Sequence, residues 1–376
     1  MSNPKVDFLN LKAQYNKISI EIDRALQTVL RRQIFILGEE VSHFEAELAQ
    51  YLSSKYVVTV NSGTDALIIS LRALGIGKGD EVITQPNSFI ATTLAITEVG
   101  ATPVFVDIDL DTLQIDSTKI ESAITNRTKA ILPVHLFGAP CKIDSILRVA
   151  KKHKLFVVED VAQAIGATYQ DKILGTYGDV GIFSFYPGKN LGAYGDGGAI
   201  STDNYTLYKK LTLLRNYGQE KKYFHTSVGI NSRLDEIQAA ILRVKLKHID
   251  VWNQKRAKCA EYYNNRLSNI LENTVTVPKV YSHGVSNHHI YPIRVSETVR
   301  DNLMEFYTGH GIQTLVHYPV PIHMQECYRP FGWKEGDFPI TEKAACELIS
   351  LPMYSELRIE QLKHVIHTTS SYFNHG

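Results

Sequence analysis

Two stretches indicate the fold of this chain, Leu155-Phe156-Val157-Val158-Glu159-Asp160-Val161-Ala162-Gln163-Ala164 and Ser184-Phe185-Tyr186-Pro187-Gly188-Lys189-Asn190. The first is an apolar run that predicts a buried strand with Asp160 at its carboxyl end. The second places an isolated lysine in a turn that contains serine and glycine. A lysine amine holds an aldehyde as a Schiff base, and a carboxylate can keep a pyridine nitrogen protonated. Together the stretches predict pyridoxal phosphate chemistry, with Lys189 and Asp160 as the catalytic residues.

Composition limits the classes of protein that remain. A chain of 376 residues is long enough for two domains or for one large α/β domain with an appendage. Its apolar content of 44% and charged content of 21% are typical of soluble globular proteins. The net charge of +1 gives no electrostatic case for nucleic acid or an anionic membrane as a partner.

Cysteine usage and the start of the chain predict a cytoplasmic protein. Cys141, Cys259, Cys327 and Cys346 are scattered without a CxxC spacing, as expected of free thiols in a reducing compartment. The first residues have no apolar core of a signal peptide, and the chain has no apolar run of membrane-spanning length.

Strand-like and helical patterns alternate through the first half of the chain. This alternation predicts a mostly parallel sheet covered on both faces by helices. The expected strands are 56–60, 81–84, 102–106, 130–134 and 155–158, and the expected helices are 64–74 and 143–153.

The pattern of predicted strands and helices changes after a long helical stretch at 234–267. A strand at 288–295 and helices at 299–310 and 341–349 follow it. We therefore predict a large cofactor-binding domain at 1–245 and a smaller C-terminal α/β domain at 246–376.

Small residues stand where the first strand becomes a helix. Gly63-Thr64-Asp65 would let backbone N–H groups and the helix dipole face a phosphate. An ordinary helix N-cap explains the same residues, but the downstream Asp160 and Lys189 favour phosphate binding. Ser184 is a further candidate phosphate ligand through its hydroxyl group.

Several segments across the chain resemble the DegT/DnrJ/EryC1/StrS family of sugar-nucleotide aminotransferases. The matching segments are Gly38–Glu45, Asn61–Leu67, Val134–Gly138, Glu159–Ala164, Ser184–Asn190 and Asn231–Ala240. The resemblance implies a fold of the aspartate aminotransferase type (pyridoxal phosphate fold type I). It also implies a homodimer whose active sites lie at the subunit interface.

The resemblance assigns further contacts to the cofactor. It implies that Phe89 stacks on the cofactor ring, that Gln163 approaches the ring or its phenolic oxygen, and that Ser62 lies at the phosphate. Asn231 would reach the phosphate in the neighbouring subunit. The alternatives are a core aromatic for Phe89, a helix-surface amide for Gln163 and a helix cap for Asn231.

Candidate substrate contacts are Tyr186, Lys222, His317 and Tyr318. Lys222 suits a diphosphate, although a solvated loop lysine is nearly as good an interpretation. His317 and Tyr318 can hydrogen-bond sugar hydroxyls, or their segment is a packed connector of the small domain. The histidines at 317 and 323 lack the additional ligands that a metal site needs, so no metal is expected.

The reaction implied by the resemblance moves an amino group from glutamate to a keto-sugar nucleotide. The run 314–325 resembles the branch that aminates C3 of dTDP-3-keto-6-deoxyhexoses, with C4 amination as the alternative. Family members that remove a sugar hydroxyl replace the reactive lysine by histidine, so Lys189 favours transamination over a dehydratase. A noncatalytic regulatory protein that binds the cofactor is the rival from another class. The product would serve deoxyaminosugar, lipopolysaccharide or other glycan biosynthesis.

Overall fold

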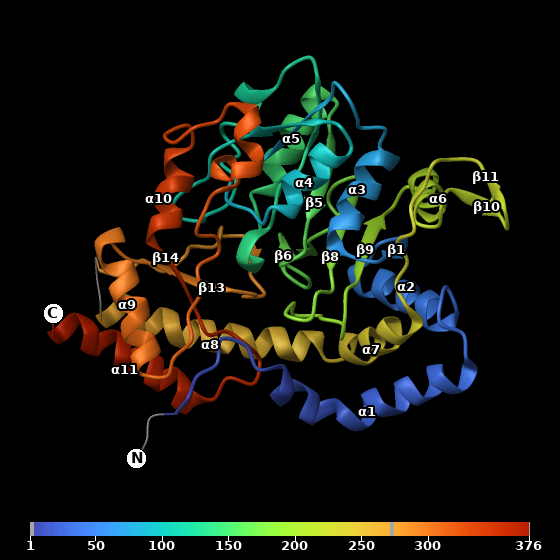
Figure 1. Cartoon of the computed structure of the whole chain (residues 1–376). Helices are drawn as coiled ribbons and strands as arrows, with labels where there is room; N and C mark the ends of the chain where they lie inside the picture. The colour runs from blue at the N-terminus through green and yellow to red at the C-terminus, as the bar shows by residue number, and fades with distance from the viewer. Residues whose placement is uncertain (1–3, 271–273, 376) are drawn as a thin grey trace.

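The computed structural model describes residues 4–270 and 274–375. At its centre lies a seven-stranded sheet with the strand order β1-β9-β8-β5-β4-β2-β3 (Figure 1). Only β9 runs antiparallel to its neighbours, and the other pairs are parallel. The predicted mostly parallel sheet is therefore confirmed. Its strands are β1 (Tyr56–Val60), β2 (Glu81–Thr84), β3 (Thr102–Phe105), β4 (Thr128–Ile131), β5 (Phe156–Asp160), β8 (Val180–Ser184) and β9 (Gly198–Thr202).

Helices cover both faces of this sheet because successive strand residues point to opposite sides. In β5, Val157 belongs to one buried cluster and Val158 to the other. The first cluster lies under α2 (Glu39–Leu52), α5 (Ile143–His153) and α7 (Glu236–Leu246), with α1 (Leu11–Arg32) packed on α7. The second lies under α3 (Gly63–Ala73), α4 (Ala91–Glu98) and α6 (Tyr205–Leu214).

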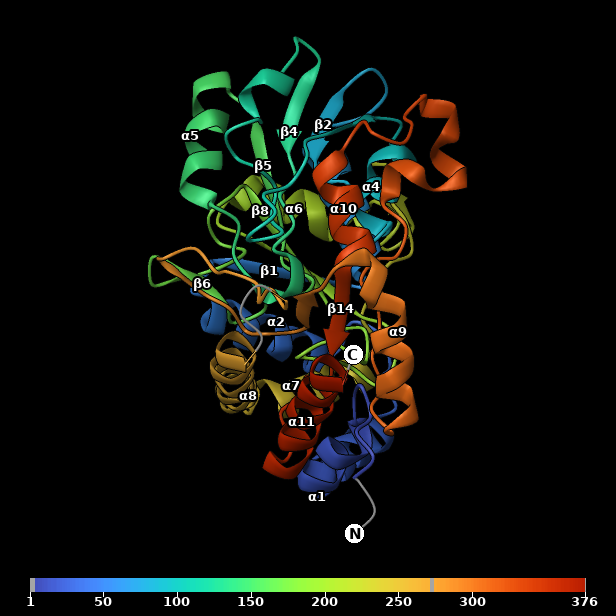
Figure 2. The ribbon, with the colours of Figure 1, turned by 90° about the vertical axis from the view of Figure 1, so that its left-hand side faces the viewer.

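A third buried cluster is built mainly by the C-terminal part of the chain. It lies below the large sheet in Figures 1 and 2, and Val6 joins it through a bridge to Ile312. Its elements are α8 (Ile249–Ile270), β13 (Tyr291–Arg294), α9 (Glu297–Gly309), β14 (Leu348–Leu351) and α11 (Ile359–His375), while α10 (Pro339–Glu347) packs on α9.

Shorter elements complete the described residues. A hairpin of β10 (Gln219–Lys221) and β11 (Phe224–His225) projects beyond α6 (Figure 1). A three-stranded sheet has the order β12-β6-β7. Its strands are β6 (Thr168–Tyr169), β7 (Lys172–Ile173) and β12 (Gly284–Val285). Four 3-10 turns are η1 (Glu121–Ala123), η2 (Leu136–Gly138), η3 (Ile322–Met324) and η4 (Glu326–Phe331).

Two helix predictions were wrong in their extent. The stretch 234–267 is two helices, α7 and α8, because the chain turns between them and the His248 N–H donates to the Lys245 carbonyl three residues back (3.0 Å). The helix expected at 341–349 ends at Glu347, since Leu348–Leu351 pairs with β13 instead. The strand expected at 288–295 is limited to Tyr291–Arg294.

Candidate active site

A cavity of about 600 Å³ opens at the carboxyl ends of the central parallel strands. Asp160 ends β5, Ser184 ends β8 and Gly63 begins the helix after β1. The topology therefore brings together residues that are far apart in sequence. The predicted residues that line the cavity are Ser62, Gly63, Thr64, Phe89, Asp160, Gln163, Ser184, Tyr186, Lys189, His317 and Tyr318.

Asp160 is a buried carboxylate held by neutral donors. Its Oδ2 accepts from the hydroxyl of Thr92 (3.1 Å) and its Oδ1 accepts from the backbone N–H of Ala162 (3.1 Å). Burial raises the pKa of Asp160 because it disfavours the charged form, and these donors and the charge of Lys189 only partly oppose it. A cationic ring nitrogen placed against this carboxylate would offset its desolvation.

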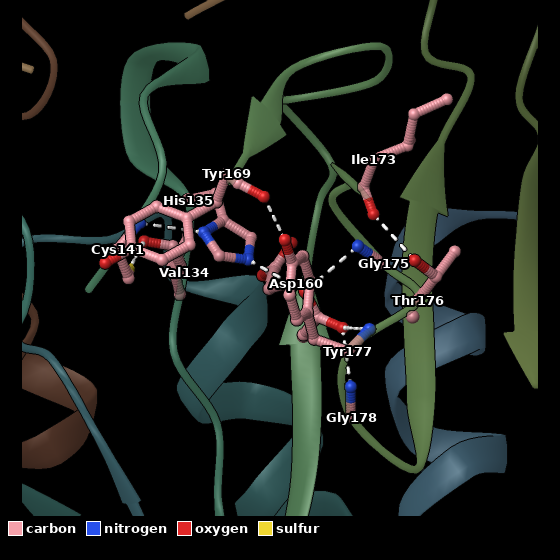
Figure 3. A network of polar contacts seen from close by, with 12 residues as sticks. Val134, His135, Cys141, Asp160, Tyr169, Ile173, Gly175, Thr176, Tyr177 and Gly178 are labelled. Atoms are coloured by element: carbon pink, nitrogen blue, oxygen red, sulfur yellow. Dashed lines mark hydrogen bonds and ion pairs between the residues drawn. The ribbon is translucent and has the colours of Figure 1, made fainter. Parts of the chain in front are cut away.

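The neighbouring Glu159 fixes the end of β5, and its side chain points to the face opposite to Asp160 because successive strand residues alternate. Figure 3 shows the groups that surround this network, among them His135, Gly175, Tyr177 and Gly178. Its carboxylate accepts from the N–H groups of Gly175 (3.0 Å), Tyr177 (2.6 Å) and Gly178 (2.8 Å), and from His135 Nε2 (3.3 Å). Burial would raise the pKa of Glu159, but these donors outweigh burial and lower it.

His135 connects this network to the backbone beside Asp160. The N–H of Cys141 donates to Nδ1 of His135 (3.0 Å), which leaves the proton on Nε2 for Glu159. The N–H of His135 donates to the carbonyl of Asp160 (3.0 Å). The network thus holds the strand end that carries the cavity carboxylate.

Lys189 lies in the turn after β8. Its N–H donates to the carbonyl of Tyr186 (2.8 Å), and the tight turn needs Gly192, where a Cβ would lie 2.4 Å from the Pro187 oxygen. Burial lowers the pKa of the Lys189 amine to about 8, although Asp160 opposes the shift. A substantial fraction of the amine is therefore neutral near pH 8, as a nucleophile or base requires.

The other end of the cavity has the features of an anion site. Gly63 begins α3, and the first N–H groups of a helix have no partner within it. A Cβ on Gly63 would lie 2.7 Å from Cβ of Ser184, so only glycine keeps this space open. Ser62 accepts from the N–H of Asp65 (3.0 Å) and so also caps the helix. The cap and the anion site are compatible, since Ser62 still has a hydroxyl proton to donate.

The positions of Gln163 and Phe89 exclude the alternative interpretations given for them above. Gln163 is only 6% exposed, so it is not a helix-surface amide, and Phe89 is 53% exposed, so it is not a core aromatic. Gln163 Oε1 accepts from the N–H of Phe137 (2.7 Å), and Nε2 donates to the hydroxyl of Tyr318 (3.2 Å). The ring of Phe89 lies 5.6 Å from that of Tyr318.

His317 faces the cavity as a neutral ring. Burial, and then the charge of Lys189, lowers its pKa to about 4. Its Nδ1 is 2.9 Å from the hydroxyl of Ser350, and its ring stacks on Phe8 at 5.7 Å. The segment is therefore not merely a connector of the small domain, because it lines the cavity.

Lys222 and Asn231 are not brought to the cavity of their own chain. Lys222 lies in the projecting hairpin, with its amine over the ring of Tyr223. Asn231 is exposed and forms a bridge with Asn216. The helix-cap alternative for Asn231 is wrong, because α7 begins at Glu236 and Asp235 occupies the cap position.

Sequence reasoning missed several residues that line the cavity, among them Phe8, Leu9, Thr92 and His289. Phe8 and Leu9 arrive from the N-terminal segment, and their place depends on the pairing of Val6 with Ile312. Thr92 gave no local signal, since its contact with Asp160 spans 68 residues. His289 lies in the strand predicted at 288–295, a pattern that gives its side chain no role in a site.

Residues 4–270 and 274–375 hold neither a candidate metal cluster nor a candidate membrane-spanning helix. No group of three or more His, Cys, Asp or Glu side chains there is arranged to hold a metal ion. No described helix combines the length and apolar character needed to cross a membrane.

The site fits pyridoxal phosphate. No cation hydrogen-bonds to the buried Asp160 within the part of the chain that the structure describes, so this carboxylate suits a protonated ring nitrogen. The start of α3 suits a phosphate, and Lys189 suits an aldehyde. The fold and the site thus define a pyridoxal phosphate enzyme of the aspartate aminotransferase type. The chain belongs to the DegT/DnrJ/EryC1/StrS aminotransferase family, whose model matches residues 16–370. The predicted family, fold, cofactor and transaminase class are confirmed.

Relatives extend over nearly the whole chain. A "dTDP-3-amino-3,6-dideoxy-alpha-D-galactopyranose transaminase" of Aneurinibacillus thermoaerophilus is 45% identical over 98% of this chain and 99% of its own. A "Pleiotropic regulatory protein" of Geobacillus stearothermophilus is also 45% identical, with the same coverage of 98% and 99%. The crystal structure of S. venezuelae DesV in complex with a ketimine intermediate is 43% identical with a TM-score of 0.96, and covers 98% of this chain and 99% of DesV.

Proposed function

We propose that this chain transfers the amino group of glutamate to C3 of a dTDP-3-keto-6-deoxyhexose. The observation that carries the proposal is the placement of Asp160, Lys189 and the start of α3 around one cavity. The name of the Aneurinibacillus relative supports the choice of C3 and of a 6-deoxyhexose.

Each proposed role follows from the position of the side chain. Pyridoxal phosphate, when bound, supplies an aldehyde and a ring that stores electrons. Asp160 would hold the ring nitrogen protonated, and Phe89 and Gln163 would face the ring. The phosphate would be held by Ser62, Gly63, Thr64 and Ser184. Lys189, whose pKa burial lowers to about 8, would carry protons on its Nζ atom at neutral pH.

The sugar nucleotide would occupy the mouth of the cavity. Tyr186 is 60% exposed there, and His317 and Tyr318 present polar ring atoms to the same space. Burial raises the pKa of Tyr318 to about 12, so its hydroxyl stays protonated and can donate to a sugar oxygen. These groups suit a polyhydroxylated ring.

The substrate is tested by locating the new amine. The enzyme is incubated with glutamate and, separately, with the 3-keto and 4-keto isomers of a dTDP-6-deoxyhexose, and the products are analysed by NMR. Amination at C3 alone is expected. Amination only at C4 would contradict the proposed regiochemistry and establish the alternative.

A noncatalytic regulatory protein is a second candidate, because the Geobacillus relative carries a regulatory name. The presence of both Asp160 and Lys189 in the cavity favours an enzyme. Absorbance spectra with and without glutamate separate the two candidates. An enzyme should lose the band of the lysine-bound cofactor as glutamate is consumed, whereas a binding protein would retain it.

We also propose a homodimer with shared active sites. The chain exposes Ile34–Leu37 and, in the projecting hairpin, Tyr223 (79%) and Phe224 (70%), which a partner subunit would cover. Asn231 and Lys222 lie outside their own cavity and would serve the cofactor phosphate and the substrate diphosphate of the partner. Mixing inactive Lys189→Ala and Asn231→Ala chains should restore some activity, and a monomeric active enzyme in sedimentation would contradict this.

The division into domains at 1–245 and 246–376 is part of the same proposal. It is supported by the turn between α7 and α8 and by the third buried cluster, most of whose residues follow that turn. The cytoplasmic location stays a prediction.

A further inference from the structure

His289 is hydrogen-bonded to Asn190, the residue that follows the reactive Lys189 in the chain. It lines the cavity together with Lys189, and its Nδ1 lies 3.0 Å from Oδ1 of Asn190. Asn190 is itself only 3% exposed, so this contact is buried. The ring is therefore fixed relative to the turn that carries Lys189.

The surroundings of Asn190 determine which nitrogen of His289 carries the proton. Nδ2 of Asn190 donates to the carbonyl of Asn287 (3.2 Å) and to Oδ1 of Asn253 (2.9 Å). Because a carbonyl can only accept, the amide is oriented with Oδ1 toward His289. Nδ1 of His289 must then be the N–H donor. Asn253 is oriented in turn, since its Nδ2 donates to the carbonyl of Ile165 (3.1 Å).

The other ring nitrogen is left as an acceptor. Burial, followed by the charges of Lys189 and Arg256, lowers the pKa of His289 well below its usual value. The ring is thus neutral, with a lone pair on Nε2. Within residues 4–270 and 274–375, neither Nε2 of His289 nor Nζ of Lys189 has a hydrogen-bond partner.

We propose that His289 is a positioning residue for Lys189, held by Asn190 in the tautomer whose Nε2 accepts a hydrogen bond from the lysine amine. Such a bond would engage one N–H group of the neutral Lys189 amine. It would thereby fix the direction in which the lone pair on Nζ points. This inference rests on the proposed function, in which Lys189 is the reacting lysine.

Two substitutions of His289 test the acceptor at Nε2 separately from the hydrogen bond between Nδ1 and Asn190. His289→Asn places an amide nitrogen where Nδ1 stands and keeps that contact, but it removes the atom at Nε2. His289→Gln reaches the position of Nε2 with an acceptor oxygen. Asn190→Ser also tests the acceptor. It keeps the His289 ring but removes the amide oxygen that selects its tautomer.

The first readout is the pKa of Lys189 in the full-length chain freed of cofactor. It is obtained from the pH dependence of acylation of the amine, mapped by mass spectrometry. Loss of an acceptor destabilises the ammonium form, so His289→Asn should lower this pKa by about one unit, and Asn190→Ser should lower it in the same direction. His289→Gln should recover most of the loss.

The second readout is the rate of each half-reaction in the holoenzyme, one with glutamate and one with the keto-sugar nucleotide. His289→Asn should slow both by about tenfold with little change in KM, because the amine loses the contact that orients its lone pair. Wild-type behaviour of His289→Asn, or no recovery by His289→Gln, would overturn the proposal. A defect confined to the keto-sugar half-reaction would also overturn it and place His289 on the sugar.

Failure of the proposed substrate can be told apart from failure of this inference. If the wild-type chain did not turn over the keto-sugar, the pKa difference between His289→Asn and His289→Gln would still test the contact with Lys189. Thermal unfolding of each variant verifies that the fold is retained.

Discussion

Replacing Glu159 by glutamine would test whether its buried carboxylate holds the end of β5. Four N–H groups converge on the two carboxylate oxygens, three from the backbone and one from His135. Glutamine keeps one oxygen and presents an NH₂ group to the donors of the other, so about two hydrogen bonds are lost. A bond to a charged group is worth roughly 1.5–3 kcal/mol, and a neutral amide is cheaper to desolvate. We expect the free energy of unfolding to fall by about 3 kcal/mol at pH 7.

The assay is guanidinium unfolding of the wild type and Glu159→Gln at several pH values. The pKa of Glu159 is lowered in the fold, because the hydrogen bonds from His135 and the backbone N–H groups outweigh burial. Its contribution is therefore fully present above the unfolded pKa of roughly 4.3 and is lost as the pH falls through the folded pKa. The difference in the free energy of unfolding between the wild type and Glu159→Gln should therefore become smaller in acid.

Glu39→Gln is the matched control, since Glu39 is exposed and pairs only with Arg32 among the described residues. It should change the unfolding free energy by no more than about 0.5 kcal/mol. A gap below about 1 kcal/mol for Glu159→Gln at pH 7, or a gap that widened in acid, would refute the reasoning.

Three further changes address the cavity. Lys189→Ala should abolish turnover because the reacting amine is lost, and borohydride followed by peptide mapping should find the cofactor on Lys189 in the wild type; a label on another lysine would contradict the assignment. Asp160→Asn should keep the fold but slow turnover by several powers of ten, on the order of a lost preorganised electrostatic contact; near wild-type rates would show that Asp160 does not face the ring nitrogen. Gly63→Ala should weaken cofactor binding by about tenfold or more, since its Cβ would lie 2.7 Å from Cβ of Ser184. Fluorescence titration measures this affinity, and an unchanged Kd would mean that the gap beside Ser184 holds no phosphate.

Much of the large sheet was predictable because most of its strands contain a short run of buried apolar residues, a local pattern that the sequence alone displays. The predicted ranges 56–60 and 81–84 and the helix 143–153 match β1, β2 and α5 residue for residue. Prediction failed where tertiary pairing overrode local pattern. Leu348–Leu351 resembles the end of a helix until β13 lies beside it.

The sequence by itself determined the chemistry, because Asp160 and Lys189 lie in short segments whose residue types and order are specific to pyridoxal phosphate enzymes. Only the tertiary structure decided which distant residues serve those two. Thr92, His289 and Phe8 enter the site through contacts that cross the fold, and no local periodicity encodes such contacts. The tautomer of His289 depends on a chain of amides anchored on backbone carbonyl groups, whose positions exist only once the chain has folded.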